Sequence, residues 1–185
     1  MPPPYVKTIK QLIFYQCAKI SSESAGFGKD NYKFITDRWK KYCSGENDLS
    51  STVRELEKER KQGEVCLYCN QTIKLTKDHM LPVSCGGEDI FDNVVWVCGS
   101  CNSKKNKRRL YEWRGLDNKD NHHRIAEGKY LKYLYALHER RGTLDLHKDE
   151  LSTLCSACDL EKRCKEESTV GKLSVFCIEG CFKNT

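Results

Sequence analysis

Two pairs of cysteines form a ligand set with the spacing of a metal site. Cys66 and Cys69 are separated by two residues, Cys98 and Cys101 repeat this spacing, and 28 residues lie between the pairs. Each pair can place two thiolates on one metal ion from a tight turn, and two such pairs complete a tetrahedral four-cysteine zinc site. The alternative, four reduced cysteines without metal, leaves the repeated spacing unexplained. We therefore predict a structural zinc that takes no part in chemistry, because four protein ligands leave no position for a substrate.

An acid, a histidine and two asparagines lie between or beside these pairs. Asp78 and His79 are adjacent, Asn93 precedes an apolar run, and Asn102 follows the last cysteine. Histidine can act as a general base near neutral pH, whereas carboxylate and amide oxygens suit a hard cation such as Mg²⁺. A zinc ion bound by both pairs would bring these side chains together. The alternative is that His79 is a structural histidine and that the other three residues cap loops or a helix.

The segment from residue 64 to residue 109 resembles the HNH, or ββα-metal, endonucleases. It contains in order CLYC, DHMLP, a Gly-Gly loop, an asparagine, and CGSCN followed by lysines. One element departs from the family's name, because Asn102 stands at the third motif position, as in many members. The resemblance implies an α+β fold with a ββα nuclease core, and hydrolysis of DNA to a 3′-hydroxyl and a 5′-phosphate. It implies that His79 is the base, that Asp78 and Asn102 bind a catalytic Mg²⁺ or Mn²⁺, and that Asn93 orients His79.

Basic residues are concentrated after the second cysteine pair. From residue 102 to residue 141, twelve lysines and arginines stand against five acids, a net charge of +7, while the whole chain carries +6. This excess indicates a polyanionic partner, and the resemblance implies double-stranded DNA. The resemblance also places Lys105 at a phosphate. A solvated face is the alternative to a ridge of phosphate-contacting residues, for which we name Lys104, Lys105, Lys107, Arg108 and Arg109.

Five more cysteines stand near the C-terminus. Cys155, Cys158, Cys177 and Cys181 can form a second zinc site, in which Cys164 could replace either of the last two. An iron–sulfur cluster and metal-free structural cysteines are the alternatives.

The surrounding pattern predicts helices before and after the site. We expect helices over residues 6–20, 30–45 and 52–63, a strand ending at His79, a second strand over 94–97, a helix opening near Cys101, and a long helix over 120–141. The predicted division is an N-terminal helical region for dimerisation or DNA contact (1–63), a nuclease core with its following helix (64–142), and a cysteine-rich zinc module (143–185).

Composition and charge bound the class of protein. The chain of 185 residues is 38% hydrophobic and 31% charged, and it contains neither an apolar run that could span a bilayer nor the pattern of a signal peptide. We expect a cytoplasmic protein of a prokaryote or a phage, without a membrane partner. The resemblance to HNH proteins implies a Type II restriction endonuclease, and cleavage of a palindrome by such an enzyme predicts a homodimer. The alternatives are a phage or homing HNH nuclease and a non-catalytic, zinc-stabilised DNA-binding module.

Overall fold

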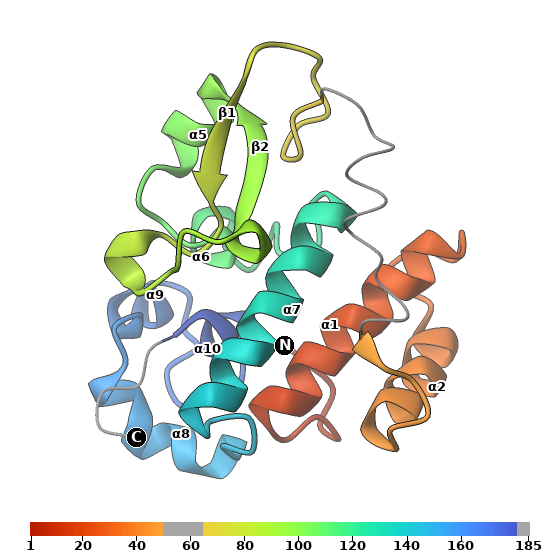
Figure 1. Ribbon diagram of the computed structural model, residues 1–185. Coiled ribbons are helices and arrows are strands. Elements are labelled where there is room, and N and C mark those ends of the chain that lie inside the picture. Colours follow the sequence, from red (N-terminus) through yellow and green to blue (C-terminus); the bar gives the residue numbers. More distant parts are fainter. Residues whose placement is uncertain (50–64, 181–185) are drawn as a thin grey trace. The chain divides into compact units, whose positions relative to one another are not determined.

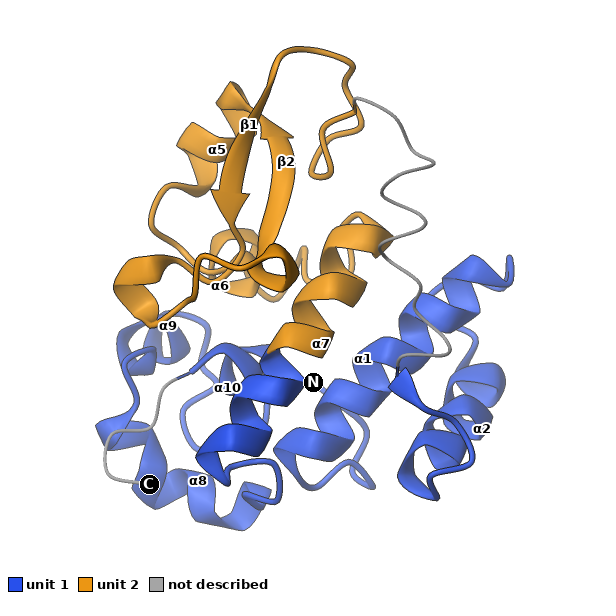
Figure 2. Cartoon of the chain, viewed as in Figure 1, with its two compact units in different colours: residues 1–49, 134–185 blue, residues 50–133 orange. Residues whose placement is uncertain are grey.

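The computed structural model describes residues 1–49 and 65–180 (Figure 1). It divides into two compact units, one formed by residues 1–49 and 134–185 and the other by residues 50–133 (Figure 2). The boundary falls inside helix α7 (Arg124–Arg141). The helix expected over residues 52–63 lies outside the described residues.

The first unit begins with two helices that pack against each other. Helix α1 (Ile9–Ser24) starts at Thr8, whose hydroxyl accepts a hydrogen bond from the Gln11 N–H at 3.2 Å. Helix α2 (Tyr32–Cys43) starts at Asn31, whose side chain accepts from the Phe34 N–H at 3.1 Å. These caps satisfy N–H groups that lack a partner within the helix. The two helices correspond to those expected over residues 6–20 and 30–45.

Segments from both ends of the sequence build this first unit together. Thr8 forms a β-bridge with His147, and α1 contacts α10 (Val175–Glu179) as well as α2. The remaining short helices are η3 (Lys148–Glu150), α8 (Leu151–Leu154), η4 (Cys155–Ala157) and α9 (Glu161–Glu166). These long-range contacts join residues 1–49 to residues 134–185. The functional division into residues 1–63, 64–142 and 143–185 stays a prediction.

The second unit contains a small antiparallel sheet followed by a helix. Strand β1 (Leu75–His79) pairs with β2 (Val94–Cys98), with Leu75 opposite Cys98 and His79 opposite Val94. Helix α5 (Gly99–Lys105) starts directly after β2 and contacts both strands (Figure 1). This mixture of helices and a small antiparallel sheet confirms the α+β prediction. It also confirms that a strand ends at His79.

Three short helical segments complete the second unit around an apolar core. They are η1 (Val83–Cys85), η2 (Phe91–Asn93) and α6 (Leu110–Arg114). Val95, Val97, Leu110 and Tyr111 are fully buried, and the burial of such side chains supplies most of the stabilising free energy of a small domain. The apolar core of the second unit therefore includes the buried face of the sheet, which Asp78 shares because it lies opposite Val95.

None of the helices in the described part of the chain is both long enough and apolar enough to cross a membrane.

Candidate active site

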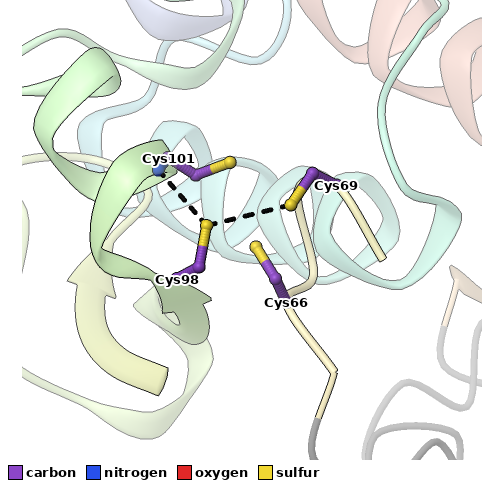
Figure 3. Close-up of side chains that lie close together, drawn as sticks. All are labelled: Cys66, Cys69, Cys98 and Cys101. Atoms are coloured by element: carbon purple, nitrogen blue, oxygen red, sulfur yellow. Dashed lines mark hydrogen bonds between the residues drawn. The ribbon is translucent and has the colours of Figure 1, made fainter. Parts of the chain in front are cut away.

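Four cysteine thiols converge at one end of the sheet. The sulfur atoms of Cys66, Cys69, Cys98 and Cys101 all lie within 4.8 Å of one another, and their side chains point toward a common centre (Figure 3). The Cys69 and Cys98 sulfurs are 3.8 Å apart. Tetrahedral zinc with Zn–S bonds of about 2.3 Å requires thiolates about 3.8 Å apart. The cluster predicted from the two CxxC pairs is therefore present and fits a structural metal such as zinc.

Backbone N–H groups donate to two of these four cysteines. The Tyr68 N–H donates to the Cys66 sulfur and the Cys101 N–H donates to the Cys98 sulfur, both at 3.4 Å. Burial alone raises the pKa of Cys98, but the Cys101 N–H and the neighbouring thiols lower it to about 7. Burial raises the pKa of Cys69 and of Cys101 in the same cluster. Because metal-bound cysteine must be deprotonated, metal binding would have to release the protons that these thiols keep.

Asp78 is buried at the inner side of β1 and is held by two donors. Its side chain is only 6% exposed. The Tyr68 hydroxyl donates to its Oδ2 at 2.7 Å, and the Lys105 ammonium donates to its Oδ1 at 3.2 Å. Lys105 also donates to the His79 carbonyl at 2.7 Å. Asp78 is thus an ordered carboxylate whose negative charge is compensated by a buried cation.

His79 points to the other side of β1, as alternation along a strand requires. Its side chain is 26% exposed, and its Nε2 lies 2.9 Å from Oδ1 of Asp89. Lys77 also pairs with Asp89, and Lys77 first and His79 second lower the pKa of this exposed carboxyl group. Asp89 is therefore ionised near neutral pH, which favours the His79 tautomer with the proton on Nε2. Nδ1 is then the acceptor nitrogen of the ring.

Asn93 fastens the loop that follows His79. Its Oδ1 accepts from the Leu81 N–H at 2.9 Å, and its Nδ2 donates to the carbonyls of Leu81 at 2.8 Å and Glu88 at 2.9 Å. The residue is fully buried. These bonds go to the backbone of the loop rather than to the imidazole, so any effect of Asn93 on His79 passes through the loop.

Asn102 lies on α5 and is attached to β1. Its Nδ2 donates to the Thr76 hydroxyl and to the Lys77 carbonyl, both at 3.1 Å. Because a carbonyl can only accept, these bonds fix which end of the amide faces the strand. Among the described residues nothing donates to its Oδ1, so this oxygen is available to a ligand. Asn102 and Asp78 thus both lie at the interface of β1 and α5.

The basic residues after the second cysteine pair are divided between the surface and the interior. Lys104, Lys107 and Arg108 are exposed, but Lys105 is 0% and Arg109 2% exposed. Arg108 donates to the carbonyls of Lys104 and Lys105 and so caps the end of α5. The structure therefore brings three of the five expected residues to the surface and places Lys105 beneath the site, on Asp78.

The second cysteine set lies in the first unit and is less convergent. Cys155, Cys164 and Cys177 are buried, Cys158 is partly exposed, and Cys181 lies outside the described residues. Burial is the main cause that raises the pKa of Cys177 to about 12. A hydrogen bond with the Ser174 backbone lowers this pKa, whereas the nearby Cys164 and Cys155 raise it. Within the described ranges, only the first set has all its ligand atoms within 4.8 Å.

Two contacts of the site had no counterpart among the residues expected from the sequence. Tyr68 lies between the first two cysteines and reaches Asp78, and Asp89 lies beyond the Gly-Gly loop and reaches His79. The contact of Tyr68 could have been expected from its position between two zinc-ligand cysteines, because zinc would hold this turn against the strand that carries Asp78. The sequence contains no comparable signal for Asp89, since the loop path decides its position.

The comparison with known families agrees with this geometry. Residues 66–111 match the family model described as HNH endonuclease. No curated protein and no solved structure shows a significant match to the chain. The matched segment contains both cysteine pairs, Asp78, His79, Asn93 and Asn102. Residues 66–111 are therefore similar to an HNH endonuclease domain.

Proposed function

We propose that this protein is a metal-dependent endonuclease that hydrolyses phosphodiester bonds of double-stranded DNA. The observation that carries the proposal is the arrangement within the HNH domain. Asp78 and His79 end strand β1, Asn102 is attached to that strand, and the four-cysteine cluster closes the same sheet.

The oxygen donors at the interface of β1 and α5 fit a hard divalent cation. Asp78 offers a carboxylate and Asn102 offers an amide oxygen, and Mg²⁺ prefers such ligands while keeping several waters. Tyr68 and Lys105 occupy part of the acceptor capacity of the carboxylate, which totals about four sites. Bound there, Mg²⁺ or Mn²⁺ would neutralise charge that develops on the scissile phosphate and the leaving oxygen.

His79 is the proposed general base. Asp89 holds the proton on Nε2, so Nδ1 can accept a proton from the attacking water. Asn93 keeps the loop between His79 and Asp89 in place through its hydrogen bonds to the backbone of Leu81 and Glu88. Attack on the phosphorus with departure of the 3′ oxygen leaves a 3′-hydroxyl and a 5′-phosphate.

DNA is proposed to contact the exposed part of the basic ridge. Lys104, Lys107 and Arg108 can reach phosphates from the end of α5, and such contacts fix the position of a protein on the duplex without reading its sequence. Lys105 and Arg109 are buried, so the proposal does not assign them to this surface.

The function is tested by incubating supercoiled plasmid and phage DNA with the purified protein in Mg²⁺, with EDTA as the control. Metal-dependent strand breaks are the expected result. DNA that stays intact while a gel shift still shows binding would overturn the proposal in favour of the non-catalytic DNA-binding module.

The finer proposal is a Type II restriction endonuclease that acts as a homodimer. Cleavage of a palindromic site needs two active sites related by a twofold axis. Discrete fragments and a dimeric mass in light scattering, free or DNA-bound, are expected. A monomeric mass both free and bound to DNA would contradict the proposed homodimer. Cleavage at a single long recognition site would instead favour a phage or homing nuclease.

We also propose a second structural zinc in the first unit. Cys155, Cys158, Cys164 and Cys177 are buried or partly buried there and form no disulfide, and Cys181 remains a candidate ligand from the sequence. Elemental analysis of the purified protein should give two zinc ions per chain. One zinc ion without iron would support metal-free cysteines, and iron with acid-labile sulfide would support a cluster.

A further inference from the structure

Both cysteine pairs of the zinc site deliver a side chain to Asp78. Tyr68 lies between Cys66 and Cys69, and its hydroxyl reaches Oδ2 of Asp78 at 2.7 Å. Lys105 lies one helical turn after Cys101 on α5 and reaches Oδ1 of the same carboxylate at 3.2 Å. The carboxylate is therefore held from both halves of the metal site.

The Tyr68 side chain is buried and is held by contacts that do not involve its hydroxyl. The residue is 6% exposed. Its ring packs against Trp113 with centroids 5.2 Å apart, and the Arg114 guanidinium donates to its backbone carbonyl at 3.2 Å. The ring and the backbone are thus fixed independently of the hydroxyl.

We propose that Tyr68 is a positioning residue that couples the four-cysteine site to the catalytic metal by orienting the Asp78 carboxylate. The hydroxyl engages Oδ2, which leaves the carboxylate in one orientation from which an oxygen can meet a divalent cation. Hydrogen bonds to metal-ligating carboxylates commonly change metal affinity or activity by about 10-fold to 100-fold. The inference rests on the proposed function, because it gives Asp78 the role of metal ligand.

The test compares Tyr68→Phe with Tyr111→Phe. Both changes remove one hydroxyl from a buried tyrosine of the same unit, but the Tyr111 hydroxyl donates to Glu127 at 3.0 Å. Mn²⁺ binding to the full-length, zinc-loaded protein is measured by electron paramagnetic resonance in the absence of DNA, and zinc content is measured in parallel. Asp78→Asn and the double variant Tyr68→Phe/Asp78→Asn complete a double-mutant cycle.

The expected result is that Tyr68→Phe keeps its zinc and binds Mn²⁺ about 10-fold more weakly or worse. Tyr111→Phe should bind like the wild type, and Tyr68→Phe should have no further effect in the Asp78→Asn background. In cleavage assays, the Mg²⁺ concentration for half-maximal rate should rise while the KM for DNA stays unchanged.

Several outcomes would overturn the inference, and they separate from failure of the proposed function. Equal Mn²⁺ affinity in the two phenylalanine variants would overturn the positioning role even if the wild type cuts DNA. Loss of zinc from Tyr68→Phe alone would make the hydroxyl a determinant of folding and would also overturn it. A wild type that binds no Mn²⁺ overturns both proposals. Tyr68-dependent Mn²⁺ binding without DNA cleavage would support the positioning role and overturn the nuclease.

Discussion

Gly87 lies against the backbone of Leu81, and its replacement by alanine is predicted to displace the loop that carries Asp89. A Cβ at residue 87 would lie 1.9 Å from the Leu81 carbonyl oxygen and 2.8 Å from Nδ2 of Asn93. Since such contacts require roughly 3 Å, the two backbone segments would have to separate by about 1 Å. The cause is contact and not backbone conformation, because Gly87 is absent from the positive-φ glycines.

This separation would break the hydrogen bonds between Asn93 and Leu81. They measure 2.8 and 2.9 Å, and an added 1 Å or so takes both beyond hydrogen-bonding distance. Buried polar groups that lose their partners cost about 1–3 kcal/mol each, so the expected loss of unfolding free energy is about 3 kcal/mol. For a chain of this size that corresponds to a Tm lower by roughly 6–12 °C. Cleavage should fall as well, because the loop places Asp89 beside His79.

Thermal unfolding followed by circular dichroism measures the effect, and Gly99→Ala is the matched control. Gly99 is the first residue of α5, and a Cβ there meets no atom within 4 Å. We expect its unfolding free energy to stay within about 0.5 kcal/mol of the wild type. Equal Tm values for Gly87→Ala, Gly99→Ala and the wild type would refute the close packing of this loop on Leu81.

Three further predictions concern the metal, the ridge and the first unit. Cys66→Ser should lose one zinc and unfold the second unit, because structural zinc supplies folding free energy. A variant that keeps all its zinc in elemental analysis and is folded by circular dichroism would contradict this. The double variant Lys104→Ala/Lys107→Ala should bind DNA with a weaker salt dependence, by the amount expected for the loss of about two phosphate contacts. An unchanged slope of log K against log salt concentration would exclude these two residues as phosphate contacts. Burial lowers the pKa of His138, so the unfolded state binds its proton first. The contribution of His138 to the unfolding free energy should therefore be fully present above about pH 6.5. It should decrease below that pH, by at most about 1.4 kcal/mol per pH unit. His138→Gln should lessen this dependence in denaturant titrations, whereas an identical pH profile would disprove it.

The cysteine site and the small sheet could be predicted because their signals are local. Two residues between cysteines fix a turn, and the apolar run through Val95 and Val97 fixes a strand, whatever the rest of the chain does. The adjacency of Asp78 and His79 on a strand likewise predicts that they face opposite sides, and the burial of Asp78 beside the partly exposed His79 fits this prediction.

The division of the basic run was not anticipated from composition. Five cations in six residues indicate a surface, yet Lys105 follows Cys101 by four residues and so shares its helix face. That face is turned to β1, and Lys105 finds Asp78 there. The spacing contained this information, but net charge alone did not.

Contacts between distant parts of the sequence were not predictable in the same way. The bridge of Thr8 to His147 and the bond from His138 to the Ile178 carbonyl at 2.8 Å join segments that no periodic pattern connects. The path of the Gly-Gly loop, which decides that Asp89 meets His79, depends on the bonds that Asn93 makes once the loop has folded.

The central claim is that His79 performs general-base catalysis in a metal-dependent DNA nuclease. Its most direct test is single-turnover cleavage of an end-labelled duplex in Mg²⁺ by the wild type and by His79→Ala, at protein concentrations that saturate binding of both. We predict that His79→Ala keeps its zinc and its DNA affinity but cuts at least about 100-fold more slowly. Cleavage by His79→Ala at the wild-type rate would contradict the assignment of the base.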